Sequence, residues 1–141
     1  MFKETVNHNA SNITPPPKLL PVLQKLKTAY LLWFTYYASI PKSHRYTLGN
    51  RIDGLFIETI EAISTAGFLN RQEKLPYVRV AIRKLDTAKV LLLVLFESKS
   101  LDNKKYIALS EPLDEVGRML GGWHGQLTKQ NSPETNSRES S

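Results

Sequence analysis

Hydrophobic residues recur at steps of three and four through four segments of the chain, which is the spacing of one face of an α-helix. No segment alternates apolar and polar residues for long, so the pattern does not require strands. We therefore predict an all-α protein with four long helices. The four apolar series are Leu19, Leu23, Leu26, Tyr30, Trp33, Tyr37 and Ile40; Leu48, Ile52, Leu55, Thr59, Ala62 and Ala66; Leu75, Val78, Ile82, Leu85, Lys89, Leu92 and Phe96; and Tyr106, Leu109, Leu113, Val116, Leu120 and Trp123.

The breaks between these segments are short. Pro41 is expected to stop the first helix, Gly67 to end the second, and Pro76 to lie in the first turn of the third. Residues 98–103 separate the third segment from the fourth. Because short connections place consecutive long helices antiparallel, the pattern predicts an up-down-up-down four-helix bundle.

Changes in composition divide the chain into three parts. Residues 1–17 end in three prolines and are predicted to be extended, and residues 126–141 are polar and predicted to be a disordered tail. The bundle is expected to span residues 18–125. Pro112 lies inside the fourth segment, where it should either kink the helix or delay its start, with Ser110 as the cap.

Two segments are apolar almost all round, namely residues 29–38 and 90–96. A bundle helix normally keeps a polar outer face, so we expect the additional apolar surface to be an oligomer interface. The alternative is that Tyr hydroxyls and the Trp33 indole tolerate partial exposure. The candidate interface or packing residues in the first segment are Tyr30, Trp33, Phe34 and Tyr37.

The chain has 141 residues and a net charge of +6. Residues 18–125 hold 16 Lys and Arg against 10 Asp and Glu, so the excess lies on the expected bundle. This favours an anionic partner such as nucleic acid, with an incidentally basic surface as the alternative. The chain has no Cys and its three His residues lack metal-ligand spacing, so we predict no metal and no cofactor.

No motif for catalysis is visible, so we predict a protein that is not an enzyme. The alternative, a metal-dependent hydrolase or nuclease, would need the acidic group Asp53, Glu58 and Glu61, which equally fits a solvated helix face. No apolar stretch reaches the length of about 18 residues that suggests a membrane span. The first residues lead into polar sequence, and we expect the protein in the cytoplasm.

Two groups of basic residues are the candidate nucleic-acid contacts. Lys42, Arg45 and Arg51 lie between the first two helices, where a connection does not require such charge. Arg79 and Arg83 lie one helical turn apart. Such clusters bind phosphates without reading sequence, although a solvated face is the alternative. The predicted set is Lys42, Arg45, Arg51, Arg79, Arg83 and Lys84. Lys89 interrupts an apolar stripe, so it must reach the surface or point into a cavity.

Two short motifs carry a resemblance to a known family. The first is Pro41-Lys42 followed by Arg45 and Leu48-Gly49, and the second is made up of Gly117, Arg118, Leu120, Gly121 and Trp123. With these motifs, the helix count and the spacing over about residues 18–125, the sequence resembles accessory variability determinant proteins of diversity-generating retroelements. These belong to a wider four-helix-bundle group that includes proteins encoded in intervening sequences of 23S rRNA genes.

The resemblance implies a barrel-shaped homopentamer that binds RNA or DNA with little sequence preference. It also implies association with a reverse transcriptase and its template RNA during mutagenic retrohoming, without catalysis by the protein itself. The third helix has few basic residues after Lys89, so the nucleic-acid surface is expected to be placed differently here. The alternative is a homo-oligomeric scaffold that binds a protein partner and has no role in a retroelement.

The glycines of the two motifs are interpreted as packing positions. Leu48-Gly49 should let the second helix start close to its neighbour, and Gly117, Gly121 and Gly122 should allow close packing. We interpret Trp123 as a core or interface anchor, with a base-stacking platform as the alternative.

Overall fold

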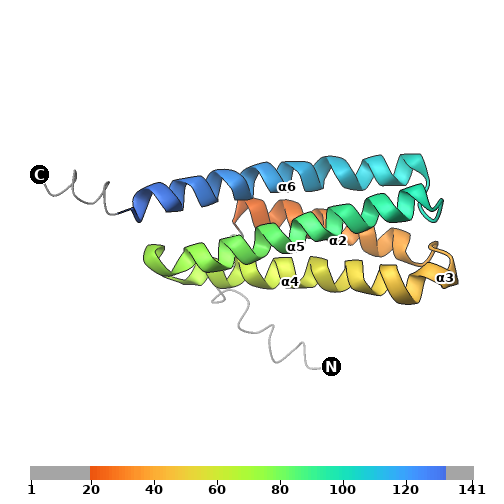
Figure 1. Ribbon diagram of the computed structural model, residues 1–141, viewed down its shortest axis with the longest axis horizontal. Coiled ribbons are helices and arrows are strands. Elements are labelled where there is room, and N and C mark those ends of the chain that lie inside the picture. The colour runs from red at the N-terminus through yellow and green to blue at the C-terminus, as the bar shows by residue number, and fades with distance from the viewer. Residues whose placement is uncertain (1–19, 133–141) are drawn as a thin grey trace, which may run out of the picture.

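The computed structural model describes residues 20–132, and all regular structure in this range is helical. Four long helices lie along one axis, each antiparallel to the next (Figure 1). They are α2 (Pro21–Tyr37), α4 (Asn50–Phe68), α5 (Arg71–Glu97) and α6 (Asn103–Gln130); a short helix α3 (Lys42–His44) and a π-helical turn η2 (Arg45–Gly49) lead into α4. Helix α4 packs on α5, α5 on α6, α6 on α2 and α2 on α4, so the predicted four-helix bundle is confirmed.

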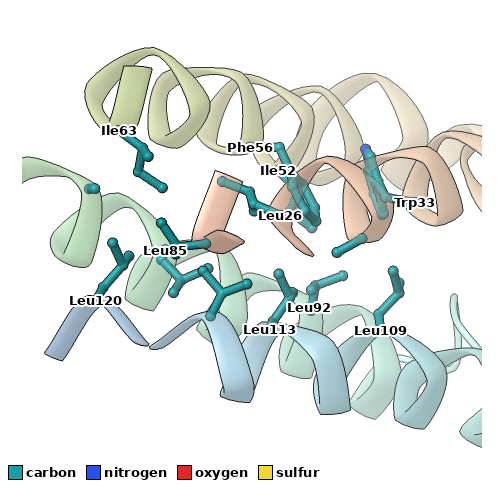
Figure 2. Packing of buried hydrophobic residues seen from close by; sticks show 14 of the residues in the cluster. Leu26, Trp33, Ile52, Phe56, Ile63, Leu85, Leu92, Leu109, Leu113 and Leu120 are labelled. Carbon is teal, nitrogen blue, oxygen red and sulfur yellow. The ribbon is translucent and has the colours of Figure 1, made fainter. Parts of the chain in front are cut away.

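The core lies between the four helices and consists largely of the predicted apolar series (Figure 2). Trp33 is fully buried, and its ring stacks on Phe56 with the ring centroids 6.0 Å apart. Truncating a buried leucine to alanine typically destabilises a protein by about 2–5 kcal/mol, so this core fixes the helices relative to one another. The fully buried leucines include Leu26, Leu55, Leu85, Leu92, Leu95, Leu109, Leu113 and Leu120.

The connection between the first two long helices is largely helical, and α2 ends at Tyr37, before Pro41. Only residues 38–41 are non-helical, because α3 and η2 already form a continuous helical path into α4. Gly49 is buried in this path, and a Cβ atom there would lie 3.2 Å from the Tyr37 ring. The prediction that Gly49 permits a close approach between the helices is therefore confirmed.

Helix α5 begins earlier than predicted from the position of Pro76. It starts at Arg71, so Pro76 lies inside the helix and not in its first turn. A proline there removes one backbone hydrogen bond, which disfavours a helix by about 3 kcal/mol. Val78 and Ala81, which follow the proline, are fully buried, and this packing outweighs the local preference.

Helix α6 also continues through its proline. The Asp102 side chain caps the helix by accepting a backbone N–H at 2.8 Å, and the helix runs past Pro112 without restarting. The expected late start with Ser110 as cap is therefore wrong. Leu109 and Leu113, on either side of the proline, are both fully buried, so tertiary packing holds this part of the helix in place.

Helix α6 extends beyond the predicted end of the bundle. Residues 126–130 were assigned to a disordered tail, but they are helical. Leu127 is buried there beside Ala66 and Val78, which explains why the helix continues. The predictions for residues 1–17 and for the end of the tail fall outside the described residues. Within residues 20–132, no helix combines the length and the apolar character needed to cross a membrane.

Candidate nucleic-acid interface

Arg45 has a structural role at the corner between α2 and α3. Its guanidinium is half-buried and donates hydrogen bonds to the carbonyl oxygens of Ala38, at 2.8 Å, and Ile40, at 3.0 Å. These carbonyls follow the end of α2, where no further helical N–H can reach them. The interpretation that the charge of Arg45 is surplus to the corner is therefore wrong. Lys42, in contrast, is exposed and its ammonium has no partner in residues 20–132.

Glu58 occupies the space between two of the predicted cations. Its Oε1 atom lies 3.1 Å from Lys84 Nζ and 3.9 Å from an Arg51 nitrogen. This oxygen is buried and accepts no hydrogen bond of good geometry, so the attraction is mainly electrostatic. The structure thus brings Arg51 and Lys84 together across α4 and α5, but one carboxylate offsets part of their charge.

Arg79 and Arg83 are the exposed pair on the flank of α5. They lie one turn apart, and neither side chain forms an ion pair within the described range. Asp86, one turn further on, is the acidic residue of α5 nearest to them in sequence. Of the six predicted contacts, Lys42, Arg79 and Arg83 are therefore the exposed side chains without a hydrogen-bond or ion-pair partner within residues 20–132.

Three further lysines lie at the same end of the bundle as Lys42. We call this end the corner end and define it as residues 38–45 and 97–105, on the right of Figure 1. Lys99 and Lys104 are exposed, and Lys105 reaches Ser39 Oγ at 3.3 Å. The sequence interpretation did not single them out. The predicted topology could have done so, because it places the first and third connections at one end.

Lys89 reaches the surface and does not point into a cavity. Its ammonium lies 2.8 Å from a carboxylate oxygen of Asp114 on α6, and both side chains are partly exposed. The long apolar stem covers the core while the charge stays in solvent. Lys89 is therefore paired and does not add to the cations available for a ligand.

The three acidic residues that a metal-dependent enzyme would need, Asp53, Glu58 and Glu61, have separate surroundings. Asp53 Oδ1 accepts hydrogen bonds from the Tyr30 hydroxyl at 2.9 Å and from Trp33 Nε1 at 3.1 Å. Burial raises the pKa of Tyr30 above its usual value of 10.0, and the hydrogen bond and charge of Asp53 raise it further. Glu58 lies between two cations, and Glu61 is exposed. No His, Asp and Glu side chains between residues 20 and 132 gather into a group that could hold a metal ion.

Exposed large apolar side chains lie on all four long helices, and several of them lie on α2 and α5, which are diagonally opposite in the bundle. On α2, Leu31 and Phe34 point outward, and Phe34 is 66% exposed. On α5, Val90, Leu93 and Val94 point outward. These residues fall in the two segments that are apolar all round. Tyr30 and Tyr37 of the predicted set are half-buried, and Trp33 is in the core.

The glycines near the end of α6 differ in their surroundings. A Cβ atom on Gly117 would lie 3.7 Å from Leu85 and 3.8 Å from Lys89 Nζ, which is ordinary contact. Gly121 and Gly122 are exposed, and a Cβ atom on either would meet nothing within 4 Å. Neither position is therefore closely packed against the rest of the same chain. Trp123 is partly buried and packs against both parts of the core.

A family model described as bAvd-like matches residues 21–127 of the chain. The match begins with α2 and ends near the end of α6, so it covers the whole bundle. No curated protein and no solved structure matches the chain.

Proposed function

The chain belongs to the bAvd-like family, and from that premise we propose a non-catalytic accessory protein of a diversity-generating retroelement that binds RNA or DNA through phosphate contacts. In this role it associates with the reverse transcriptase and the template RNA in the cytoplasm and assists mutagenic retrohoming. The observation that carries the proposal is the family match over all four helices. The exposed cations without ion pairs support its chemistry.

Phosphate binding is the chemistry that these cations suit. Arg79 and Arg83 present two guanidinium groups on one side of α5, and neither forms an ion pair within residues 20–132. Each phosphate that such a group neutralises releases counterions, so the affinity should fall steeply with salt. Phosphates carry no sequence information, so the protein should bind unrelated sequences with similar affinity.

The same proposal includes assembly into a homopentamer. The exposed apolar residues of α2 and α5 face away from each other, because these helices are diagonal in the bundle. One copy can therefore place its α2 surface on the α5 surface of the next, and such a heterologous contact closes into a ring when the rotation between copies is a whole fraction of a full turn. The number five comes from the family resemblance. Five copies would carry a charge of about +30, which favours nucleic-acid binding.

Binding is tested with the double variant Arg79→Gln/Arg83→Gln. We expect the affinity for RNA and for DNA to fall by about tenfold at low salt and the salt dependence to become shallower. The matched control is Lys27→Gln/Arg118→Gln, which removes two exposed charges from α2 and α6. Binding by the wild type that does not change with salt would contradict phosphate contact, and equal losses in both double variants would contradict the assignment to α5.

The partner and the assembly need separate tests. The reverse transcriptase of the same element should co-purify with this protein after nuclease treatment, and its failure to do so would favour the scaffold alternative.

Phe34→Glu places a charge on the exposed α2 surface and should dissociate the assembly. A wild-type protein that is monomeric by light scattering would contradict the homopentamer.

A further inference from the structure

The corner end joins two connections that are far apart in the sequence. His44 Nδ1 lies 2.6 Å from Ser100 Oγ, which links α3 to the connection between α5 and α6. Lys105 also crosses between them, since its ammonium reaches Ser39 and lies 5.5 Å from the Tyr36 ring centroid. Side chains on the two connections are therefore held in a fixed relation to each other.

This end carries a large share of the charge of the chain. Residues 38–45 and 97–105 hold five Lys and Arg against two acidic residues, so half of the net charge of +6 lies on them. One of the two acids, Asp102, is occupied in capping α6. Lys42, Lys99 and Lys104 are exposed, and their ammonium groups have no partner in the described part of the chain.

Lys99 occupies a backbone conformation that favours glycine. Its φ is 67°, and no other non-glycine residue between 20 and 132 has a positive φ. The Lys99 N–H donates to the Phe96 carbonyl at 3.0 Å, and the Ser100 N–H donates to the Leu95 carbonyl at 2.8 Å. This is the Schellman arrangement, in which the left-handed residue is usually glycine. Lysine therefore makes the turn less stable than glycine would, and it adds only a cation.

The chemistry of the corner end fits a phosphate chain better than a protein surface. None of the exposed large hydrophobic residues of the described chain falls within residues 38–45 or 97–105. Protein interfaces depend on buried aromatic and aliphatic anchors, whereas a polyanion requires only exposed cations and donors. We infer that the corner end is a second phosphate-binding surface for nucleic acid, with Lys42, Lys99 and Lys104 as contacts. This inference rests on the proposed function and adds a site apart from the α5 flank.

The decisive variant is Lys99→Gly, because its effects on stability and on binding should have opposite signs. The thermal midpoint should stay the same or rise, since glycine suits the left-handed position. The affinity for a single-stranded RNA of mixed sequence should fall by about two- to fivefold, and the salt slope should fall by about 0.7. The triple variant Lys42→Gln/Lys99→Gly/Lys104→Gln should lose at least about tenfold.

Two controls separate this inference from the proposed function. Lys27→Ala removes one exposed lysine from the middle of α2 and should bind RNA like the wild type. If Arg79→Gln/Arg83→Gln weakens binding but the triple variant does not, the corner end is excluded and the proposed function stands. If the wild type binds neither RNA nor DNA, the proposed function fails as well. Binding of poly-glutamate, but not nucleic acid, at the corner end would overturn the inference in favour of an acidic protein partner.

Discussion

The two ends of the bundle are built from different chemistry. The corner end is polar and basic, and the side chains of His44, Ser100 and Lys105 link its two connections. The opposite end, on the left of Figure 1, holds the connection between α4 and α5 and the end of α6; we call it the apolar end because Phe68 is 92% exposed there, although Arg71 and Lys129 are exposed as well. Each end also holds an open cavity. The cavity at the apolar end is about 390 Å³ and is lined by Leu20, Pro21, Val22, Lys74, Met119 and Trp123, and the cavity at the corner end is about 380 Å³ and is lined by Phe96, Glu97, Lys99, Leu101, Asp102 and Asn103.

Each end uses one cation to complete a helix terminus. Arg45 donates to carbonyls that follow α2, and Lys74 Nζ donates to the Ala66 carbonyl in the last turn of α4 at 2.7 Å. Lys74 also lies 6.0 Å from the Trp123 ring centroid. A basic residue at a helix end is thus no sign of function by itself. Exposed cations beyond this structural need remain at both ends, and the corner end has more of them, with Lys42, Lys99 and Lys104 against Arg71 and Lys129.

The largest loss of stability should come from truncating Trp123, which lines the cavity at the apolar end. Trp123→Ala removes a side chain that packs on both parts of the core, so the free energy of unfolding should fall by about 3 kcal/mol. Urea denaturation measures this loss. The RNA affinity of the folded variant should equal that of the wild type. A variant as stable as the wild type that binds RNA poorly would instead identify Trp123 as a base-stacking platform.

A smaller loss should follow from removing the capping cation of the corner end. Arg45→Met keeps an apolar stem but loses both hydrogen bonds to carbonyls, so the free energy of unfolding should fall by about 1–2 kcal/mol. Lys42→Met nearby removes an equal charge without a hydrogen bond and should change stability by about 0.5 kcal/mol or less. Equal stability of the two variants would contradict the distinction between capping and surplus cations.

A stabilising change is expected in α6 towards the apolar end. Gly121→Ala places a methyl group where nothing lies within 4 Å, and alanine favours a helix over glycine by about 1 kcal/mol. The monomer should therefore become more stable by about that amount in thermal denaturation. If the variant is instead destabilised and its assembly weakened, another copy of the chain packs closely on Gly121.

The smallest expected effect is a change in the pH dependence of stability caused by Tyr30, which lies in the middle of the bundle and at neither end. The raised pKa of Tyr30 means that the folded protein keeps this proton after the unfolded chain has released it. The stability contributed by Tyr30 is therefore complete below about pH 10 and is lost as the pH rises towards the folded pKa. The free energy of unfolding should fall less steeply above pH 10 in Tyr30→Phe. Identical slopes in both proteins would contradict this account.

The sequence predicted the helices and most of the core because burial repeats with the helical period. It failed where packing outweighs local preference, as at Pro76, which lies inside α5, and in the late start expected for α6, which instead runs through Pro112. It also failed at Arg45, because a capping role depends on where the carbonyls of α2 point, and no residue pattern records that. The lysines of the corner end could have been grouped from the predicted topology, but their contacts with Ser39 and Tyr36 required coordinates.

The central claim, that nucleic acid contacts the basic corner end and the α5 flank but not the apolar end, is tested most directly by photocrosslinking of bound RNA. Exposed aromatic side chains are available both near the corner end, at Tyr46, and at the apolar end, at Phe68. We predict that mass spectrometry finds crosslinked peptides containing residues of the corner end and of the α5 flank. Crosslinks confined to Phe68 and Trp123 would contradict the account.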